Sequence, residues 1–250
     1  MQPAKAGFAL RMGDSTLILG HRLSQWCGHA PVLEEDLALA NTALDLLGQA
    51  RRWFSYAGEL EGKGRDEDDF AFKRDAHEYR NFLLVEQDNG NYADTLARQF
   101  YFDLWHQLQL AELMNSSDVQ VAAMARQGHT EVIFHARRSS DLVIRLGDGT
   151  SESHRRMQQA LDEFWIYTGE LFEADVEDDA LIADGIVPDV GLLQAPWLEQ
   201  VTKVLKEGTL RMPSATGMRS GGRRGLHSER LGFLLAEMQF LPRAYPGAKW

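Results

Sequence analysis

Residues 33–60 read LEEDLALANTALDLLGQARRWFSYAGEL, a stretch without proline and without glycine before Gly48, and this predicts one long helix. Pro31 precedes the stretch and acidic side chains fill its first turn, where negative charge is favourable. Apolar residues cover more than half of the expected circumference: Leu37, Leu39, Ala40, Ala43, Leu44, Leu46, Leu47, Ala50, Trp53 and Phe54. A helix with so large an apolar surface is expected to lie inside a helical bundle.

Helical patterns separated by short breaks extend in both directions from this stretch. The expected helices cover residues 16–27, 72–85, 92–114, 118–146, 151–172, 196–207 and 228–241, with Asp118 as an N-cap. Residues 61–69 are expected to form an exposed loop, and residues 173–179 an acidic turn. No series of strand patterns interrupts them. The sequence therefore predicts an all-α helical bundle, with residues 1–250 as a single domain.

Composition restricts the cellular setting and the class of partner. The 250 residues are 44% hydrophobic, yet no apolar run approaches the roughly 18 to 20 residues of a membrane span. The first residues lack a signal-peptide pattern and Cys27 is the one cysteine, so we expect a cytoplasmic protein. The net charge of -11 argues against nucleic acid as a partner.

A bundle of this size could hold a di-iron centre, which uses one Glu from each of two helices and a Glu-x-x-His pair from each of two others. None of the eight histidines follows a Glu at that spacing. Asp103 precedes His106 by three residues, and Glu131 precedes His135 by four. We expect Asp103 and His135 to be buried polar groups with structural partners, and a single-metal site is the weaker alternative.

Other chemical motifs are weaker still. Cys27 lies near His29 but has no further feature of a nucleophile, so we expect a packed thiol. The segment GGRRG at residues 221–225 is basic and precedes a helix, which suits either a phosphate group or, more commonly, an interface with another chain.

Four stretches carry a specific resemblance that extends over almost the whole chain. They are LGHRLSQWCGHAPVLEEDLALANTALDLLGQAR, LLVEQDNGNYADTLARQFYFDLWH, GGRRGLHSERLG and LAEMQF. These stretches resemble the non-catalytic C subunits of ring-1,2-phenylacetyl-CoA epoxidase, a multicomponent bacterial monooxygenase of phenylacetate degradation. The resemblance implies a ferritin-like helical bundle with additional C-terminal helices, related to the catalytic subunit that holds the di-iron centre and binds the CoA ester.

The same resemblance places the six ligand positions of the catalytic relative on this chain. The relative's helical Asp-Glu-x-Gly-His corresponds to residues 45–49, and its second Glu-x-x-His to residues 132–135. The implied positions are Gln25, Leu46, Gln49, Asp103, Val132 and His135. Only Asp103 and His135 keep a ligand type, so no metal and no catalytic residue is expected in this chain.

The resemblance thus implies a structural subunit that pairs with the catalytic di-iron subunit and works with a reductase partner. Candidate contacts are Trp26, His29, Arg219, Arg223, Arg224 and His227, together with exposed aromatics such as Trp105. Two other functions stay open. One is an enzyme with a single metal held by Asp103, His106, Glu131 and His135. The other is a module that binds the CoA moiety through Arg223 and Arg224.

Overall fold

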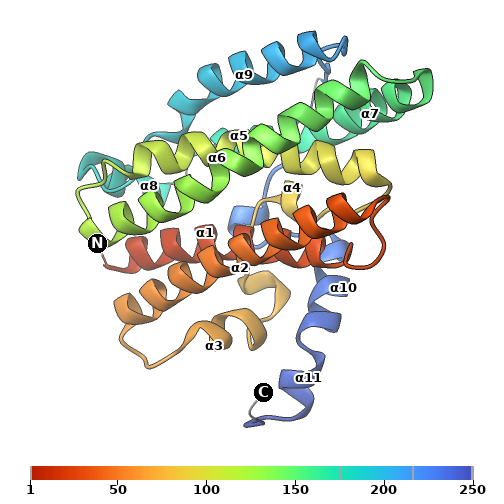
Figure 1. Cartoon of the computed structure of the whole chain (residues 1–250). Helices are drawn as coiled ribbons and strands as arrows, with labels where there is room; N and C mark the ends of the chain where they lie inside the picture. Colours follow the sequence, from red (N-terminus) through yellow and green to blue (C-terminus); the bar gives the residue numbers. More distant parts are fainter. Residues whose placement is uncertain (1, 175, 216, 249–250) are drawn as a thin grey trace. The chain divides into compact units, whose positions relative to one another are not determined.

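A computed structural model describes residues 2–174, 176–215 and 217–248, and every regular element within these ranges is a helix (Figure 1). This confirms the predicted all-α class. None of the described helices combines the length and the apolar character that a membrane crossing requires. The chain divides into two compact units, each made of segments distant in sequence, and each is described by itself. The expectation of a single domain stays a prediction.

Unit 1 comprises residues 1–29, 36–88 and 221–250. Its helices are α1 (Gln2–Ser24), α2 (Leu33–Glu61, whose first residues belong to unit 2), α3 (Glu67–Phe72), η1 (Ala76–Glu78), α4 (Leu83–Glu86), η5 (Gly222–Arg224), α10 (Glu229–Met238) and α11 (Phe240–Ala244). The ring of Phe8 on α1 meets that of Trp53 on α2 edge-on, with 5.8 Å between centroids. Aromatic and aliphatic packing between α1 and α2 thus forms the core of this unit.

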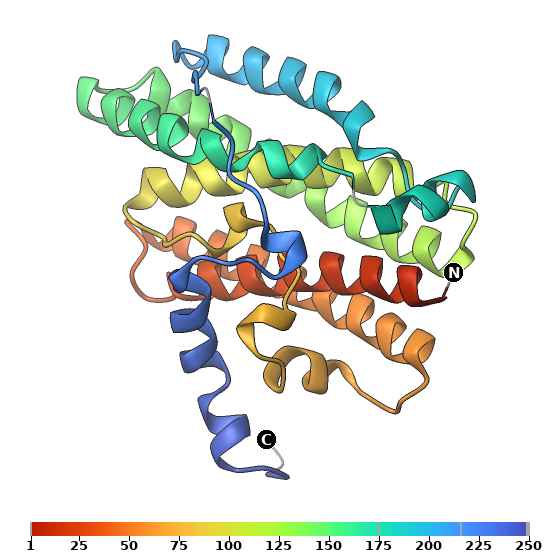
Figure 2. The same cartoon turned by 180° about the vertical axis from the view of Figure 1, so that it is seen from behind.

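Unit 2 comprises residues 30–35 and 89–220. Its helices are α5 (Tyr92–Leu113), α6 (Val119–Gly147), α7 (Ser151–Phe164), η2 (Trp165–Tyr167), η3 (Gly169–Phe172), α8 (Val176–Ala183), η4 (Val190–Leu193) and α9 (Gln194–Glu207). The two long helices α5 and α6 pack along each other, and α7 and α9 pack against them (Figure 2). The buried rings of Tyr101, Trp165 and Trp197 lie within 5.8 Å of one another and join α5, η2 and α9.

The long helices α2, α5 and α6 were predicted well, whereas α1 and the short helices were not. The start of α2 at Leu33 and the N-cap of α6 are confirmed, since the Asp118 carboxylate accepts hydrogen bonds from the backbone N–H groups of Gln120 and Val121. The expected helix over 72–85 is wrong and is replaced by η1 and α4 with extended backbone between them. The expected acidic turn over 173–179 overlaps α8, and its residue 175 lies outside the described residues.

The first helix was predicted too short. The expected start at Thr16 is wrong because α1 begins at Gln2 and runs through Gly13, Asp14 and Ser15, which read locally as a break. Asp14 is fully buried there and forms an ion pair with Arg74, which donates from Nη1 to Asp14 Oδ2 at 3.1 Å. A partner sixty residues away therefore compensates the buried charge on this helix, and the local sequence does not show that partner.

Two features of the expected core are also corrected. Leu37 and Leu44 on α2 are 56% and 67% exposed, so the buried face of this helix is narrower than its apolar residues suggest. Trp105 was expected to be an exposed contact, and this is wrong because its side chain is buried in unit 2. A tryptophan on a long amphipathic helix packs wherever the tertiary contacts bury it, and its side chain alone does not show which face that is.

Candidate functional site

A row of polar side chains follows one face of α5 in the interior of unit 2. The Asn91 side chain caps this helix by accepting the N–H of Ala93 at 2.8 Å. From this fixed start, Gln99, Asp103 and His106 recur at spacings of four and three residues, so they share one face. All three are buried. A buried polar row on a core helix is the natural place to look for a ligand or a catalytic group.

Asp103 is the carboxylate in this row. Gln99 donates a hydrogen bond from Nε2 to Asp103 Oδ1 at 2.6 Å, which confirms that Asp103 has a structural partner. The other oxygen, Oδ2, is buried and has no hydrogen-bond partner among the described residues. Burial raises the pKa of Asp103 to about 6, although His135, Ser139 and Gln99 each act to lower it. Burial therefore makes the ionised form of Asp103 less favourable than that of an exposed carboxyl group.

His106 is an isolated neutral imidazole. Burial, together with the nearby His135 and His129, lowers its pKa to about 3. The imidazole lies among aromatic rings, 5.0 Å from Phe102 between centroids, and neither of its nitrogens meets a hydrogen-bond partner in the described chain. An unsatisfied buried donor costs about 1–3 kcal/mol. With so low a pKa and no polar partner in the described chain, His106 does not resemble a catalytic base, whose pKa lies near the operating pH.

Helix α6 contributes the other candidates of unit 2. Val132 and His135 are buried, whereas Glu131 is only half-buried. The buried Ser139 hydroxyl donates to the backbone carbonyl of Ala136 at 3.3 Å. His135 and Ser139 lie near Asp103, because both act on the pKa of its carboxyl group. Val132 contributes only apolar volume to the interior.

These residues do not fit a metal centre. Within the described ranges, no group of three or more His, Cys, Asp or Glu side chains is arranged so that it could hold a metal ion. In unit 1, Leu46 is fully buried and Gln49 is buried on the same helix, while Gln25 lies exposed in the turn after α1 and accepts a hydrogen bond from Arg22 at 3.3 Å. A leucine and a neutral amide offer no anionic oxygen to iron, so these side chains do not suit a di-iron centre.

The candidate contact residues differ in how far they are exposed. His29, Arg219 and Arg224 are exposed, and Trp26 and Arg223 are half-buried. The Arg223 guanidinium lies 5.9 Å from the centre of the Phe82 ring. Cys27 is exposed, so the expectation of a packed thiol is wrong. The role of these residues in binding a partner stays a prediction.

His227 belongs to a buried cluster that the sequence did not reveal. Its Nδ1 lies 2.7 Å from Glu86 Oε2, and Glu86 also accepts hydrogen bonds from the Asn81 side chain at 3.0 Å and the Ser228 backbone N–H at 2.7 Å. Burial alone would lower the pKa of His227, but the Glu86 carboxylate outweighs burial and raises it. Glu86 and His227 are 141 positions apart, so only an acidic residue in the apolar run LLVE hinted at a partner.

The glycine-rich segment before His227 is explained by close packing. A Cβ atom on Gly222 would lie 2.2 Å from the carbonyl oxygen of Asn81, and one on Gly225 would lie 2.3 Å from that of His77. Gly225 also has a φ of 79°, in the left-handed region that favours glycine. The glycines therefore allow this loop to approach the backbone of residues 77–83.

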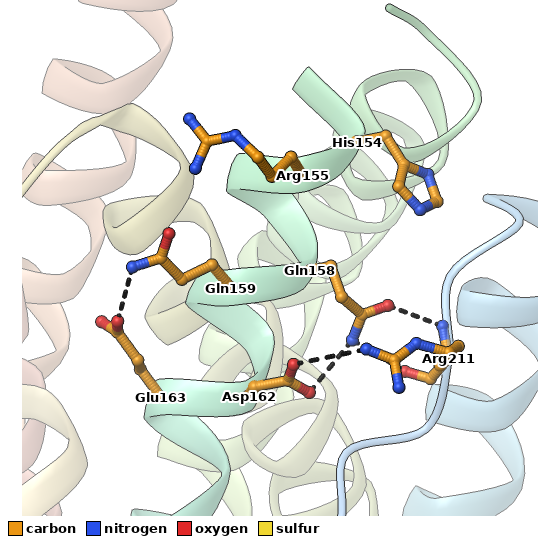
Figure 3. A pocket seen from close by; sticks show the side chains of 7 residues that line it. All are labelled: His154, Arg155, Gln158, Gln159, Asp162, Glu163 and Arg211. Carbon is orange, nitrogen blue, oxygen red and sulfur yellow. Dashed lines mark hydrogen bonds and ion pairs between the residues drawn. The ribbon is translucent and has the colours of Figure 1, made fainter. Parts of the chain in front are cut away.

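A surface pocket of unit 2 lies beside α7 and has a volume of about 540 Å³ (Figure 3). Its polar side chains already bind one another. Gln158 accepts the backbone N–H of Arg211 at 2.7 Å and donates to Asp162 at 3.0 Å, and Gln159 donates to Glu163 at 2.8 Å. Gln158 thus links α7 to the segment after α9 by a hydrogen bond. None of the predicted site residues lines this pocket.

A further groove is described in each unit. One of about 350 Å³ lies between α6 and α9 in unit 2, and one of about 500 Å³ lies between α1, α2 and α3 in unit 1. The second groove is lined by apolar side chains that include Leu17 and Phe54, and also by His21. Burial lowers the pKa of His21 and so favours its neutral form. Neither groove contains Asp103, His106 or His135.

Comparison with known proteins gives two concordant results. A family described as phenylacetic acid catabolic protein matches residues 1–250. The chain is similar to the C subunit of the 1,2-phenylacetyl-CoA epoxidase of Escherichia coli (strain K12), with 51% identity over 243 residues, which cover 97% of this chain and 98% of that protein. Together with the helical architecture, the match confirms the predicted ferritin-like helical bundle with additional C-terminal helices.

Proposed function

Because the chain belongs to the phenylacetic acid catabolic protein family, we propose that it is a structural subunit of a phenylacetyl-CoA 1,2-epoxidase. In this role it carries no metal of its own, and it pairs with the di-iron catalytic subunit and stabilises it. The complete assembly, with its reductase, acts in the cytoplasm in aerobic phenylacetate catabolism. The 51% identity to the C subunit of the Escherichia coli epoxidase supports this proposal.

The observation that carries the metal-free role is the nature of the residues at the implied ligand positions. Leu46 and Val132 are both fully buried and fill their surroundings with apolar atoms. An ionised ligand in either place would need a cation or a hydrogen-bond partner to offset its loss of hydration. Apolar side chains remove that requirement, and they suit a bundle that keeps its fold without chemistry.

Exposed apolar side chains on the long helices support the pairing. Leu37 and Leu44 are exposed on α2 in unit 1, and Phe134 is exposed on α6 in unit 2. Large apolar side chains that gather on the outside of a protein mark surfaces that another protein covers. Such a contact would stabilise the catalytic subunit by mass action, because this chain would bind only the folded form of the catalytic subunit.

The test uses this chain and the catalytic subunit from the same organism. We expect mass spectrometry to find iron in the complex and none in this chain purified alone. We also expect the melting temperature of the iron-free catalytic subunit to rise when this chain is present. One or two irons per isolated chain would contradict the metal-free role, and an unchanged melting temperature would contradict the stabilising one.

A further inference from the structure

The C-terminal arm, defined as residues 226–248 with α10 and α11, presents an unusual outer surface. Figure 2 shows these helices in blue, leading toward the C-terminus of the chain. Phe233 is 68% exposed, Phe240 is 64% exposed and Tyr245 is 60% exposed. Aromatic side chains of this size are enriched at protein interfaces, where a few of them supply most of the binding energy.

Polar contacts hold the beginning of the arm in place on unit 1. His227 and the backbone of Ser228 bind the buried Glu86 carboxylate. Arg22 on α1 donates from Nη2 to the backbone carbonyls of Glu86 at 2.7 Å and of Arg230 at 3.2 Å. The inner side of α10 then buries Leu231, Leu234 and Leu235.

The end of the arm is held by a second set of hydrogen bonds. The buried Gln239 side chain donates to the carbonyl of Ala71 at 3.2 Å and to that of Arg74 at 3.0 Å. Arg243 donates to the same Arg74 carbonyl at 2.8 Å and to Asp75 at 3.0 Å. Phe233 and Phe240 therefore lie on a backbone that is held on both sides, which lowers the entropy cost of binding a partner.

The charge of the outer surface indicates what kind of partner fits. The arm's cations are engaged, because Arg230 pairs with Asp88 and Arg243 pairs with Asp75. Glu229, Phe233 and Glu237 follow one another at intervals of four residues on α10 and are all exposed, and Glu237 also interacts electrostatically with the buried Arg22. A second copy of this surface would bring carboxylate against carboxylate, whereas a surface with Lys or Arg at its border would complement it.

The size of the surface shows that the arm does not make a stable contact alone. Three aromatic side chains at this exposure would bury roughly 300–500 Å². A stable interface buries about 800 Å² on each partner. The three aromatic side chains supply only part of that area, so other residues of this chain must also contact the partner. Leu37 and Leu44 on α2 belong to the same unit and offer further apolar area.

We infer that the C-terminal arm is a docking surface for the catalytic subunit, and that it fits an apolar groove bordered by Lys or Arg side chains. This inference rests on the function proposed above. It adds to that function the element that binds and the chemistry of the surface that receives it.

The experiment measures the dissociation constant between the full chain and the purified catalytic subunit by calorimetry. We expect the double variant F233S/F240S to raise the dissociation constant about tenfold or more, with an unchanged circular dichroism spectrum. Leu192→Ser is the matched control, because Leu192 is equally exposed on η4 in unit 2, and it should leave the constant unchanged.

A second pair of variants tests the charge. E229K/E237K should weaken binding and make the dissociation constant less dependent on salt, whereas Glu199→Lys on α9 should do neither. Undiminished binding by both double variants would overturn the inference and leave the proposed function intact. Loss of self-association in F233S/F240S with unchanged binding would also overturn it, because the arm would then join two copies of this chain. Absence of binding by the unmodified chain would instead overturn the proposed function.

Discussion

The imidazole of His227 is hydrogen-bonded on both sides, with Nδ1 2.7 Å from Glu86 Oε2 and Nε2 3.0 Å from the backbone carbonyl of Tyr79. A carboxylate and a carbonyl both accept hydrogen bonds, so both ring nitrogens must donate. His227 is therefore an imidazolium in the folded protein, paired with a carboxylate that is completely buried.

This pair predicts a pH dependence of stability. The folded state raises the pKa of His227 above its unfolded value near 6.5, so the pair stabilises the protein fully below that pH. The contribution is lost as the pH rises through the folded-state pKa. We expect urea unfolding to give a free energy that falls above about pH 6.5, and the decrease should be smaller in His227→Gln. Exposed His29 provides the control, since His29→Gln should keep the decrease of the unmodified chain. Equal pH profiles for the unmodified chain and His227→Gln would refute the assignment.

The Asp14–Arg74 pair predicts a large effect of a single charge. Asp14→Ala leaves the buried Arg74 guanidinium without its carboxylate and removes the acceptor of the Arg80 backbone N–H. We expect a loss of about 3–5 kcal/mol in the free energy of unfolding, measured by urea titration. Glu152→Ala removes the carboxylate of an exposed pair with Arg155 and should leave the midpoint nearly unchanged. Similar effects of the two substitutions would contradict this account.

Two glycines in the C-terminal segment predict opposite effects of the same substitution. Gly222→Ala places a methyl group 2.2 Å from the Asn81 carbonyl oxygen, so the loop must move, and we expect a loss of roughly 1–3 kcal/mol. Gly232→Ala meets open space within α10 and should stabilise the chain by about 0.5–1 kcal/mol, because alanine is the better helix former. Thermal unfolding of the two variants measures both. A stable Gly222→Ala protein would show that the loop does not need its close approach to residues 77–83.

The burial of Val132 predicts how much stability is lost when one acidic residue is restored at an implied ligand position. Val132→Glu buries a carboxylate among apolar side chains, and we expect a loss of at least several kcal/mol in the free energy of unfolding. Phe134→Glu introduces the same group two residues away at an exposed position and should change the stability of the isolated chain little. Iron should be absent from both variants after incubation with Fe(II), since one carboxylate does not complete a centre. Tight iron binding by Val132→Glu would show that the other ligands are already in place.

The sequence determined the class of fold and the positions of α2, α5 and α6. Acidic residues after Pro31 fixed the start of α2, and the Asp118 carboxylate fixed the start of α6, because helix ends depend on neighbours within one turn. The histidine spacings and the resemblance both indicated that the ligand set was incomplete. These features are local, or belong to a family pattern that the residues themselves carry.

The tertiary structure alone decided which surfaces are buried and which charges meet. Leu37 and Trp105 are both large apolar residues on long helices, yet packing exposes one and buries the other. The Glu86–His227 pair joins residues 141 positions apart and fixes the C-terminal arm on unit 1. Periodicity gives the face of a helix but not the partner of that face, because the partner depends on how distant segments pack. For that reason the exposure of the aromatic side chains on the C-terminal arm emerged only from the folded chain, although the sequence predicted a helix over 228–241.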